Sequence, residues 1–165
     1  TTTATEQVAT TTSTIAQVTA TTFHVTTTEE PVLTTQRYEE NDPKLQWAGS
    51  WTFTGGADDS GGSCVYTEDN SASVTLKFTG VSVSLVTRVG LALGKIQVTL
   101  DSGTPNTIDC YSSTPGYQQI IWAADPIPNA THYLKLECTG TSNPASGGTG
   151  IYIDAFAITG TLEAL

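Results

Sequence analysis

The sequence predicts an all-β protein, an antiparallel sandwich of two sheets preceded by an extended N-terminal arm. Apolar and polar residues alternate through residues 73–86, SVTLKFTGVSVSLV, which is the period-two pattern of strands with one buried and one solvent-facing side. Similar stretches recur between turn signals rich in Gly, Pro and Asn, which favours roughly eight or nine short strands. No stretch combines a sustained helical period with capping residues.

Charge and length narrow the classes of partner. The 165 residues include 16 acidic and 6 basic side chains, for a formal net charge of −10 at pH 7. Nucleic acid and anionic membranes are disfavoured, because phosphate binding depends on Lys and Arg. A cation such as calcium, or a neutral glycan, remains compatible. No apolar run approaches the roughly 20 residues of a membrane-spanning helix. The chain starts at Thr1 without Met, so we expect a processed product or part of something longer.

Residues 1–36 differ in composition from the rest of the chain. Sixteen of them are Thr, and none is Lys or Arg. Thr and Val favour extended backbone, and apolar residues recur there, mostly spaced by two, at Val18, Ala20, Phe23 and Val25. One interpretation is a solvated stalk that carries O-linked sugars. The other, which we expect, is an arm that adds a strand to an exposed sheet edge of another copy.

The sandwich domain is expected over residues 37–165, and its first strands are short. Inward-facing pairs are expected at Leu45/Trp47 and Trp51/Phe53. A polar, Gly-rich loop follows at residues 55–62, and residues 64–67 form a strand. The alternating stretch 73–86 then predicts a hairpin with a turn or kink at Gly80, since glycine admits backbone angles that other residues avoid.

The second half of the domain continues this pattern. Alternation predicts strands over residues 95–101, 107–111, 117–123 and 131–139. Residues 125–129, DPIPN, carry two prolines that exclude regular structure. The last strand is expected over residues 150–159, and two phases stay open there. Either Ile151, Ile153 and Ala155 face the core, or Tyr152, Asp154, Phe156 and Ile158 do.

The three cysteines lack the CxxC spacing of zinc sites. Buried free thiols are the simpler expectation, because such thiols behave as small hydrophobic side chains. The alternative is one disulfide with one thiol left over. Cys110 and Cys138 are in phase with inward apolar positions, although the sequence alone does not give the distance between their Cα atoms.

Several short segments carry a family resemblance in their order and spacing: Tyr38-Glu39-Glu40 with Asp42, Gly49-Ser50-Trp51, Phe78-Thr79-Gly80-Val81-Ser82-Val83, Gly94-Lys95-Ile96-Gln97-Val98 with Leu100-Asp101, Ile108-Asp109-Cys110-Tyr111-Ser112, Tyr117-Gln118-Gln119, Thr131-His132 with Leu134, and Ile153-Asp154-Ala155-Phe156. Over residues 38–158 the chain resembles jelly-roll domains of the galactose-binding-like class. These are related to carbohydrate-binding modules and occur on bacterial surface proteins, glycoside hydrolases and phage tail or fibre proteins. The resemblance implies a jelly-roll β-sandwich, but this fold serves adhesion, assembly and polymer binding alike.

The same resemblance implies a calcium site. In similar carbohydrate-binding modules, an acidic residue near the first strand and an Asp on the last strand often hold a structural calcium ion. The matching residues here are Glu39, Glu40 and Asp154, and hard cations prefer clustered oxygen ligands. The alternative is that Asp154 is a structural residue satisfied by hydrogen bonds.

A sugar site needs an aromatic platform beside a few polar groups, because sugars present apolar C–H faces ringed by hydroxyls. Tyr117, which follows Pro-Gly, is the best candidate platform. Trp47 and Trp122 are further candidates, although a place in or beside the core suits both better. Asp58, Asp59 and Gln118 are the candidate polar partners.

No catalytic constellation is recognisable. The two histidines, His24 and His132, have no assignable nucleophile, and neighbouring carboxylates such as Asp58 and Asp59 rarely straddle a scissile bond. A structural role is expected for His132. We therefore predict a protein that is not an enzyme: an extracellular or virion structural subunit of a filament, fibre or shell. Its partners would be other copies of itself, joined through the arm. The alternative is a carbohydrate-binding or adhesion module of a surface or phage tail protein.

Overall fold

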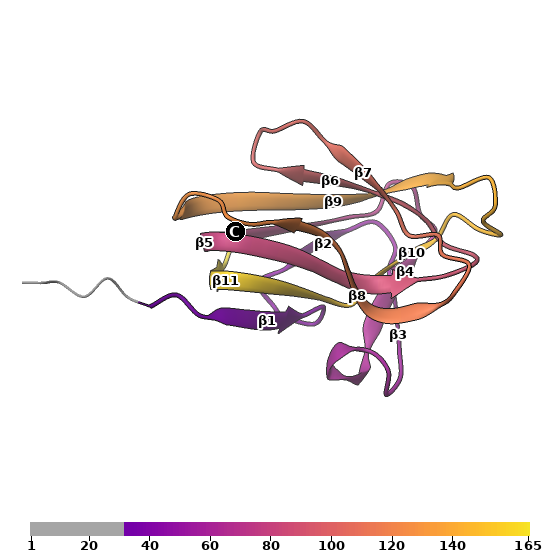
Figure 1. Ribbon diagram of the computed structural model, residues 1–165, viewed down its shortest axis with the longest axis horizontal. Helices are drawn as coiled ribbons and strands as arrows, with labels where there is room; N and C mark the ends of the chain where they lie inside the picture. The colour runs from indigo at the N-terminus through magenta and orange to yellow at the C-terminus, as the bar shows by residue number, and fades with distance from the viewer. Residues whose placement is uncertain (1–31) are drawn as a thin grey trace, which may run out of the picture. The chain divides into compact units, whose positions relative to one another are not determined.

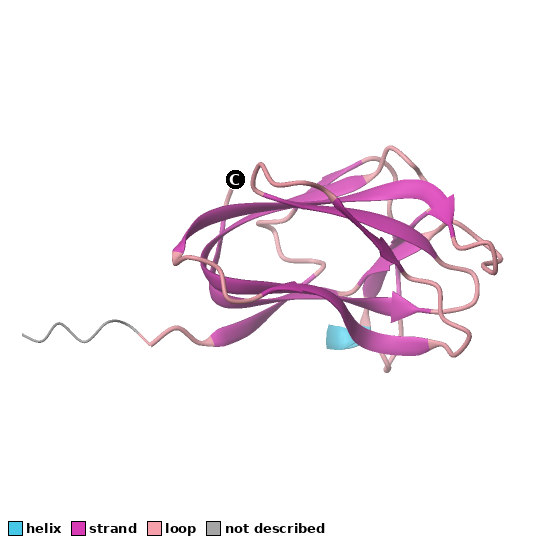
Figure 2. Cartoon of the chain, turned by 45° about the horizontal axis from the view of Figure 1, so that its top comes forward, coloured by secondary structure: helices cyan, strands magenta, loops and turns pink. Residues whose placement is uncertain are grey.

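A computed structural model describes residues 32–165. The predicted assembly arm with Val18, Ala20, Phe23 and Val25 lies outside the described residues. Within them the chain forms eleven strands and one short 3-10 turn, η1, at Ser60–Gly62, and it contains no α-helix. The predicted all-β antiparallel sandwich is confirmed (Figure 1). Figure 2 shows the strands in two layers that face each other.

The strands form two sheets, in which every pair is antiparallel. The large sheet has the order β1-β11-β5-β9-β6-β7, and β2 and β8 also pair with β5. Its strands are β1 (Thr35–Glu39), β2 (Gln46–Ala48), β5 (Ser73–Val89), β6 (Gly94–Leu100), β7 (Asn106–Asp109), β8 (Gly116–Ala124), β9 (Ala130–Ser142) and β11 (Ala155–Glu163). The small sheet has the order β10-β4-β3, formed by β10 (Ile151–Ile153), β4 (Cys64–Thr67) and β3 (Thr52–Thr54).

The central element is β5, and it corrects the predicted hairpin. Residues 73–86 belong to one continuous strand. The first half of this strand pairs with β9, its last part pairs with β8, and β11 runs along its other edge. A Cβ at Gly80 would lie 2.2 Å from the carbonyl oxygen of Thr159, next to the register shift between Thr159 and Gly160. Gly80 is therefore needed for close approach at a bulge, not for a turn.

Alternation along β5 places its apolar side chains in the core, as predicted. Its residues in the core are Val74, Leu76, Phe78, Val83 and Leu85. Large side chains from β6, β9 and β11 pack against them, and truncating one such residue to Ala typically destabilises a protein by about 2–5 kcal/mol. One predicted inward residue is placed wrongly, since Phe53 on the short strand β3 is 65% exposed.

The last predicted strand is divided at Asp154. Ile151 and Ile153 are buried in β10, whereas Phe156 and Ile158 are buried in β11. Each of the two predicted phases is therefore correct for one half of the segment, because the inward face changes where the chain passes from the small sheet to the large one. Asp154 remains at this junction and is fully buried.

All three cysteines are buried free thiols, and the disulfide alternative is excluded. Cys138 pairs with Ile96 on β6. Cys110 follows β7 on the other side of β6, where its N–H donates to the Gly94 carbonyl. Two strand spacings, roughly 10 Å, thus separate the two cysteines, whereas a disulfide requires Cα atoms closer than about 7 Å.

His132 on β9 has a structural role. It is buried and stacks on Phe78, with 5.3 Å between the ring centroids. Its Nδ1 lies 2.8 Å from Asp101 Oδ2, and its Nε2 lies 2.8 Å from the Pro128 carbonyl oxygen. Both partners are acceptors, so both contacts are hydrogen bonds only when the imidazole is doubly protonated. Burial lowers the pKa of His132, but the hydrogen bonds to Asp101 and Pro128 outweigh burial and raise this pKa above its ordinary value.

This arrangement predicts a pH-dependent contribution to stability. A histidine whose pKa is raised in the folded state stabilises the fold fully below its unfolded pKa of about 6.5. The contribution is lost as the pH rises through the folded pKa. We expect His132→Gln to be less stable than the wild type at pH 5.5, and the gap in unfolding free energy to narrow by pH 9. Urea unfolding of both proteins across this range measures the gap, and a gap independent of pH contradicts the prediction.

Candidate functional site

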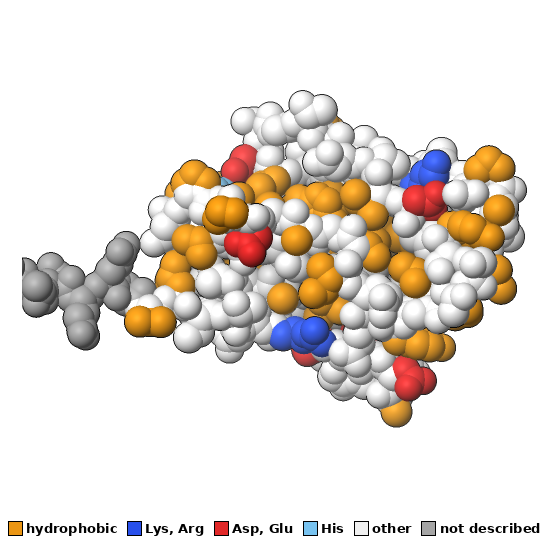
Figure 3. All heavy atoms as spheres, in the orientation of Figure 1, with side chains coloured by type: hydrophobic (Ala, Val, Ile, Leu, Met, Phe, Trp, Pro, Cys, Tyr) orange, Lys and Arg blue, Asp and Glu red, His pale blue; other side chains and the backbone are white. Residues whose placement is uncertain are grey.

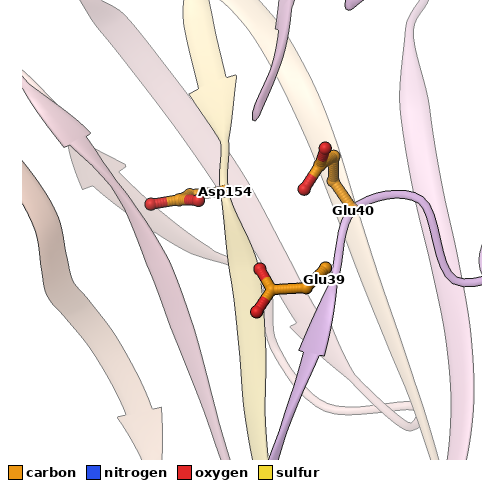
Figure 4. Close-up of side chains that lie close together, drawn as sticks. All are labelled: Glu39, Glu40 and Asp154. Carbon is orange, nitrogen blue, oxygen red and sulfur yellow. The ribbon is translucent and has the colours of Figure 1, made fainter. Parts of the chain in front are cut away.

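Three predicted metal ligands meet where β1 ends beside the β10–β11 junction. One carboxylate oxygen from each of Glu39, Glu40 and Asp154 lies within 4.8 Å of the others. Figure 4 shows Glu39 and Glu40, from one strand end, beside Asp154 at the junction of β10 and β11. The backbone sets this proximity, because Glu39 pairs with Ala155 and the Glu40 N–H donates to the Asp154 carbonyl.

The acidic cluster, Glu39, Glu40 and Asp154, is short of compensating groups. Glu40 and Asp154 are fully buried. The Ser60 N–H donates to Asp154 Oδ1 at 3.0 Å, and the hydroxyls of Ser60 and Ser63 donate to Glu39 and Glu40. The Oε2 atoms of Glu39 and Glu40 are buried without a hydrogen-bond partner, and within residues 32–165 no Lys or Arg forms an ion pair with the cluster.

This environment fits a hard cation. Burial raises the pKa of Asp154 to about 6, because charge in a desolvated site is unfavourable unless it is compensated. Clustered carboxylate oxygens with free lone pairs are the donor set that calcium prefers. We propose that Glu39, Glu40 and Asp154 hold a structural calcium ion. Such an ion would supply the missing positive charge and tie the end of β1 to the junction.

A second group of polar contacts lies on the adjoining loop. Asp59 is buried, and its carboxylate forms a two-point ion pair with Arg88 on β5, with Nε–Oδ1 at 2.7 Å and Nη2–Oδ2 at 2.5 Å. The Gly56 N–H also donates to Asp59. The hydrogen bond from Arg88 is the main cause that lowers the pKa of Asp59. Both oxygens of this predicted sugar-binding residue are therefore already engaged within the protein.

The aromatic platform predicted at Tyr117 is present at the start of β8. Its side chain is 44% exposed. The Arg88 guanidinium carbon lies 5.0 Å from the centroid of the Tyr117 ring and 4.4 Å from that of Tyr152. Tyr152 in turn packs on Tyr66, with ring centroids 4.7 Å apart. Arg88 therefore backs Tyr117 from the protein side, in the geometry of a cation–π contact.

Gln118, the next residue, links β8 to the loop. Its Oε1 accepts from Arg37 Nη1 at 2.8 Å, and its Nε2 donates to the Asp58 carbonyl at 3.0 Å. Its backbone has φ +49°, a left-handed conformation that is uncommon for a residue with a side chain. The β5–β8 register also shifts at this point, and such bulges redirect side chains.

The structure unites only part of the predicted sugar site. Tyr117, Gln118 and Asp58 lie together, and Asp58 is exposed on the loop. Trp47 lies elsewhere, because it pairs at the beginning of β5 whereas β8 starts opposite the end of β5. Trp47 is half-buried and packs edge-on against Trp51.

Sequence reasoning missed Arg37, Ser60, Arg88 and Tyr152 as contributors to this region. Their contacts join segments far apart in the chain, which no local pattern predicts. The one available signal was Arg88 itself, a cation in a strand otherwise rich in Val, Ser and Thr, in a chain with only six cations.

The described part of the chain encloses no pocket. Figure 3 shows one face on which charged side chains are few and scattered. A ligand at Tyr117 would therefore lie on an open surface and not in a pocket. Residues 32–165 also contain no helix with the length and apolarity needed to cross a bilayer.

Comparison with known proteins finds partial similarity to proteins that are named as carbohydrate-active enzymes. No family model matches it. Over 100 residues it is 29% identical to an A type blood α-D-galactosamine galactosaminidase from Flavonifractor plautii, a match that covers 61% of this chain and 9% of that protein. The chain thus spans less than a tenth of the length of this relative.

Solved structures show the same fold at low identity. A xanthan lyase from Paenibacillus has TM-score 0.56 and 17% identity, over 76% of this chain and 13% of that one. A family two carbohydrate esterase from Cellvibrio japonicus has TM-score 0.54 and 15% identity, over 78% and 34%. An exo-β-1,3-galactanase from Phanerochaete chrysosporium, solved with galactose, has TM-score 0.53 and 22% identity, over 76% and 29%.

These findings correct the predicted function. The prediction that the protein is not an enzyme is contradicted, because the relative is named a galactosaminidase and the structural neighbours include an esterase, a galactanase and a lyase. The predicted likeness to sandwich domains of carbohydrate-active proteins is confirmed. The link to phage tails or fibres is not shown, and the assembly subunit is not supported. The findings favour the carbohydrate-related alternative.

The calcium proposal predicts a stability change on metal addition. Calcium should raise the melting temperature of the chelator-treated protein, because the ion neutralises buried carboxylates and binds only the folded state. Asp154→Asn should remove most of this shift. Glu137→Gln, at a partly exposed carboxylate on β9 that pairs with Lys135 and lies outside the acidic cluster, is the matched control and should keep it. Differential scanning calorimetry measures the shift, and equal melting temperatures with calcium and with chelator contradict the proposal.

Proposed function

We propose that residues 32–165 form a carbohydrate-binding domain of a larger, extracellular or surface-associated carbohydrate-active enzyme. We propose further that this domain binds a neutral glycan at Tyr117. The similarity to one relative named a galactosaminidase, and to sandwich domains within a lyase, an esterase and a galactanase, supports the setting. The observation that carries the proposal is the Tyr117 ring, which is half-exposed and backed by Arg88.

The groups around Tyr117 match the two kinds of surface that a sugar presents. The exposed ring offers an apolar platform for the C–H face of a pyranose. The Gln118 amide, which follows Tyr117 in the chain, retains one N–H and one oxygen lone pair beyond its bonds to the Asp58 carbonyl and to Arg37, and the Asp58 side chain is exposed. Both groups can offer hydrogen bonds to hydroxyls. An aromatic platform with a few polar groups is the general form of such sites. Because the surface is open, a glycan chain could continue past the contact on either side.

The charges favour a neutral glycan over an acidic one. The Arg88 charge is neutralised by Asp59 in a close ion pair. Arg37 is engaged by Gln118 and Ser60. Asp58 is exposed, and the chain carries a net charge of −10. An approaching carboxylate or sulfate would thus meet mostly repulsion, although Arg37, whose hydrogen-bond partners are neutral, stays outside the ion pairs of residues 32–165.

Binding is tested with β-1,3-galactan, the first probe that the named relatives suggest, and with polygalacturonate as the acidic counterpart. We expect measurable affinity for the neutral polymer and none for the acidic one. Tyr117→Ala should weaken binding at least about tenfold, because a lost aromatic stack is worth ~1.4 kcal/mol or more. Tyr133→Ala on β9 is the matched control, since Tyr133 is 47% exposed and lies outside the site.

Isothermal titration calorimetry gives these affinities. If Tyr117→Ala binds the neutral polymer as tightly as the wild type does, Tyr117 is not part of the binding site. A panel of neutral glycans that all fail to bind the wild type would overturn the proposed function.

A further inference from the structure

We infer that Arg88 is a positioning residue that holds the Tyr117 ring in the orientation in which it binds sugar, an inference that rests on the proposed function. Arg88 would act through Tyr117 and not by touching the glycan, because its guanidinium group is engaged on the protein side of the ring.

The first support is the way Arg88 is held. Two parallel hydrogen bonds to Asp59 fix both the place and the plane of the guanidinium group, as two-point Arg–carboxylate pairs do. Asp59 is itself fixed by the Gly56 N–H. The Arg88 side chain is only 18% exposed and that of Asp59 only 1%, so water competes little for this pair.

The second support is the position of Arg88 between two rings. Its guanidinium carbon lies 4.4 Å from the centroid of the half-buried Tyr152 ring and 5.0 Å from that of the half-exposed Tyr117 ring. Tyr152 rests on Tyr66 of β4. A column of ring, guanidinium and ring thus runs from the small sheet to the Tyr117 platform.

The physical gain is pre-organisation. Immobilising a rotamer-rich side chain on binding weakens affinity, because the side chain loses conformational entropy. Tyr117 lies near the start of β8, which pairs only with β5 among the described strands, so the backbone constrains the ring from one side. Contact with Arg88 orders the ring before the sugar arrives.

A merely electrostatic role would be the simpler explanation, because buried Asp59 needs a counter-charge. The two roles separate in a lysine variant. Lysine supplies a positive charge to Asp59, but it lacks the planar fork that pairs at two points and stacks on aromatic rings. Arg88→Lys should therefore keep the charge balance and lose the ordering of Tyr117.

The experiment measures two properties of Arg88→Lys in the whole chain. We expect its affinity for β-1,3-galactan to fall about 5- to 10-fold at unchanged stoichiometry. In the absence of ligand, we also expect the NMR resonances of the Tyr117 ring in Arg88→Lys to move toward those of a freely rotating side chain. Comparison with the spectrum of Tyr117→Phe assigns these resonances. The converse exchange, Lys135→Arg in an exposed pair on β9, is the control and should change neither property.

Wild-type affinity together with unchanged Tyr117 resonances in Arg88→Lys would overturn the inference. If the wild type binds no glycan, the proposed function fails separately, and the ring resonances still decide whether Arg88 orders Tyr117. If Arg88→Lys does not fold, Asp59→Asn carries the test, because it loosens the guanidinium group while leaving it in place. If the Tyr117 ring is equally ordered in Asp59→Asn and in the wild type, the inference is overturned.

Discussion

Two neighbouring residues, Asp59 and Ser60, connect the two proposed sites of this sandwich. Asp59 binds Arg88 on β5, and Ser60 donates its N–H to Asp154 at the β10–β11 junction. One contact leads to the Tyr117 platform and the other to the acidic cluster. Because both depend on the same short loop, the platform and the cluster share a support, although Asp59 and Ser60 themselves contact different strands. The rest of the proposed site depends on this loop keeping its contacts with Arg88 and Asp154.

Departures from regular strand geometry allow the sandwich to form these loop contacts. Asp154 is buried where the inward face of the chain changes between β10 and β11, so a carboxylate occupies a position that regular alternation would give to an apolar residue. Gln118 has a left-handed backbone opposite a register shift in β5. Such departures from regular strand geometry are unfavourable by themselves. Here they place polar groups at one end of an otherwise apolar core.

The regular parts of the fold were predictable from the sequence, and the irregular parts were not. Alternation predicted the strands and most of the core of β5, because side-chain period and burial are coupled in a sheet. The preference of glycine for turns led to a wrong prediction at Gly80, whose role depends on a neighbouring strand brought close by the fold. Glu39, Glu40 and Asp154 were grouped through a family resemblance and do lie together. Arg88 was missed because its partners, Asp59 and Tyr152, lie far from it in sequence.

The central claim is that glycan binding takes place at the Tyr117 end of the domain. Titrating the ¹⁵N-labelled protein with a neutral β-1,3-linked galacto-oligosaccharide, and following backbone amide resonances, tests this most directly. The account predicts saturable shifts concentrated at residues 116–119 and 56–60, with smaller shifts near Arg88. Saturable shifts centred on Trp47 and Trp51, with residues 116–119 unaffected, would contradict it.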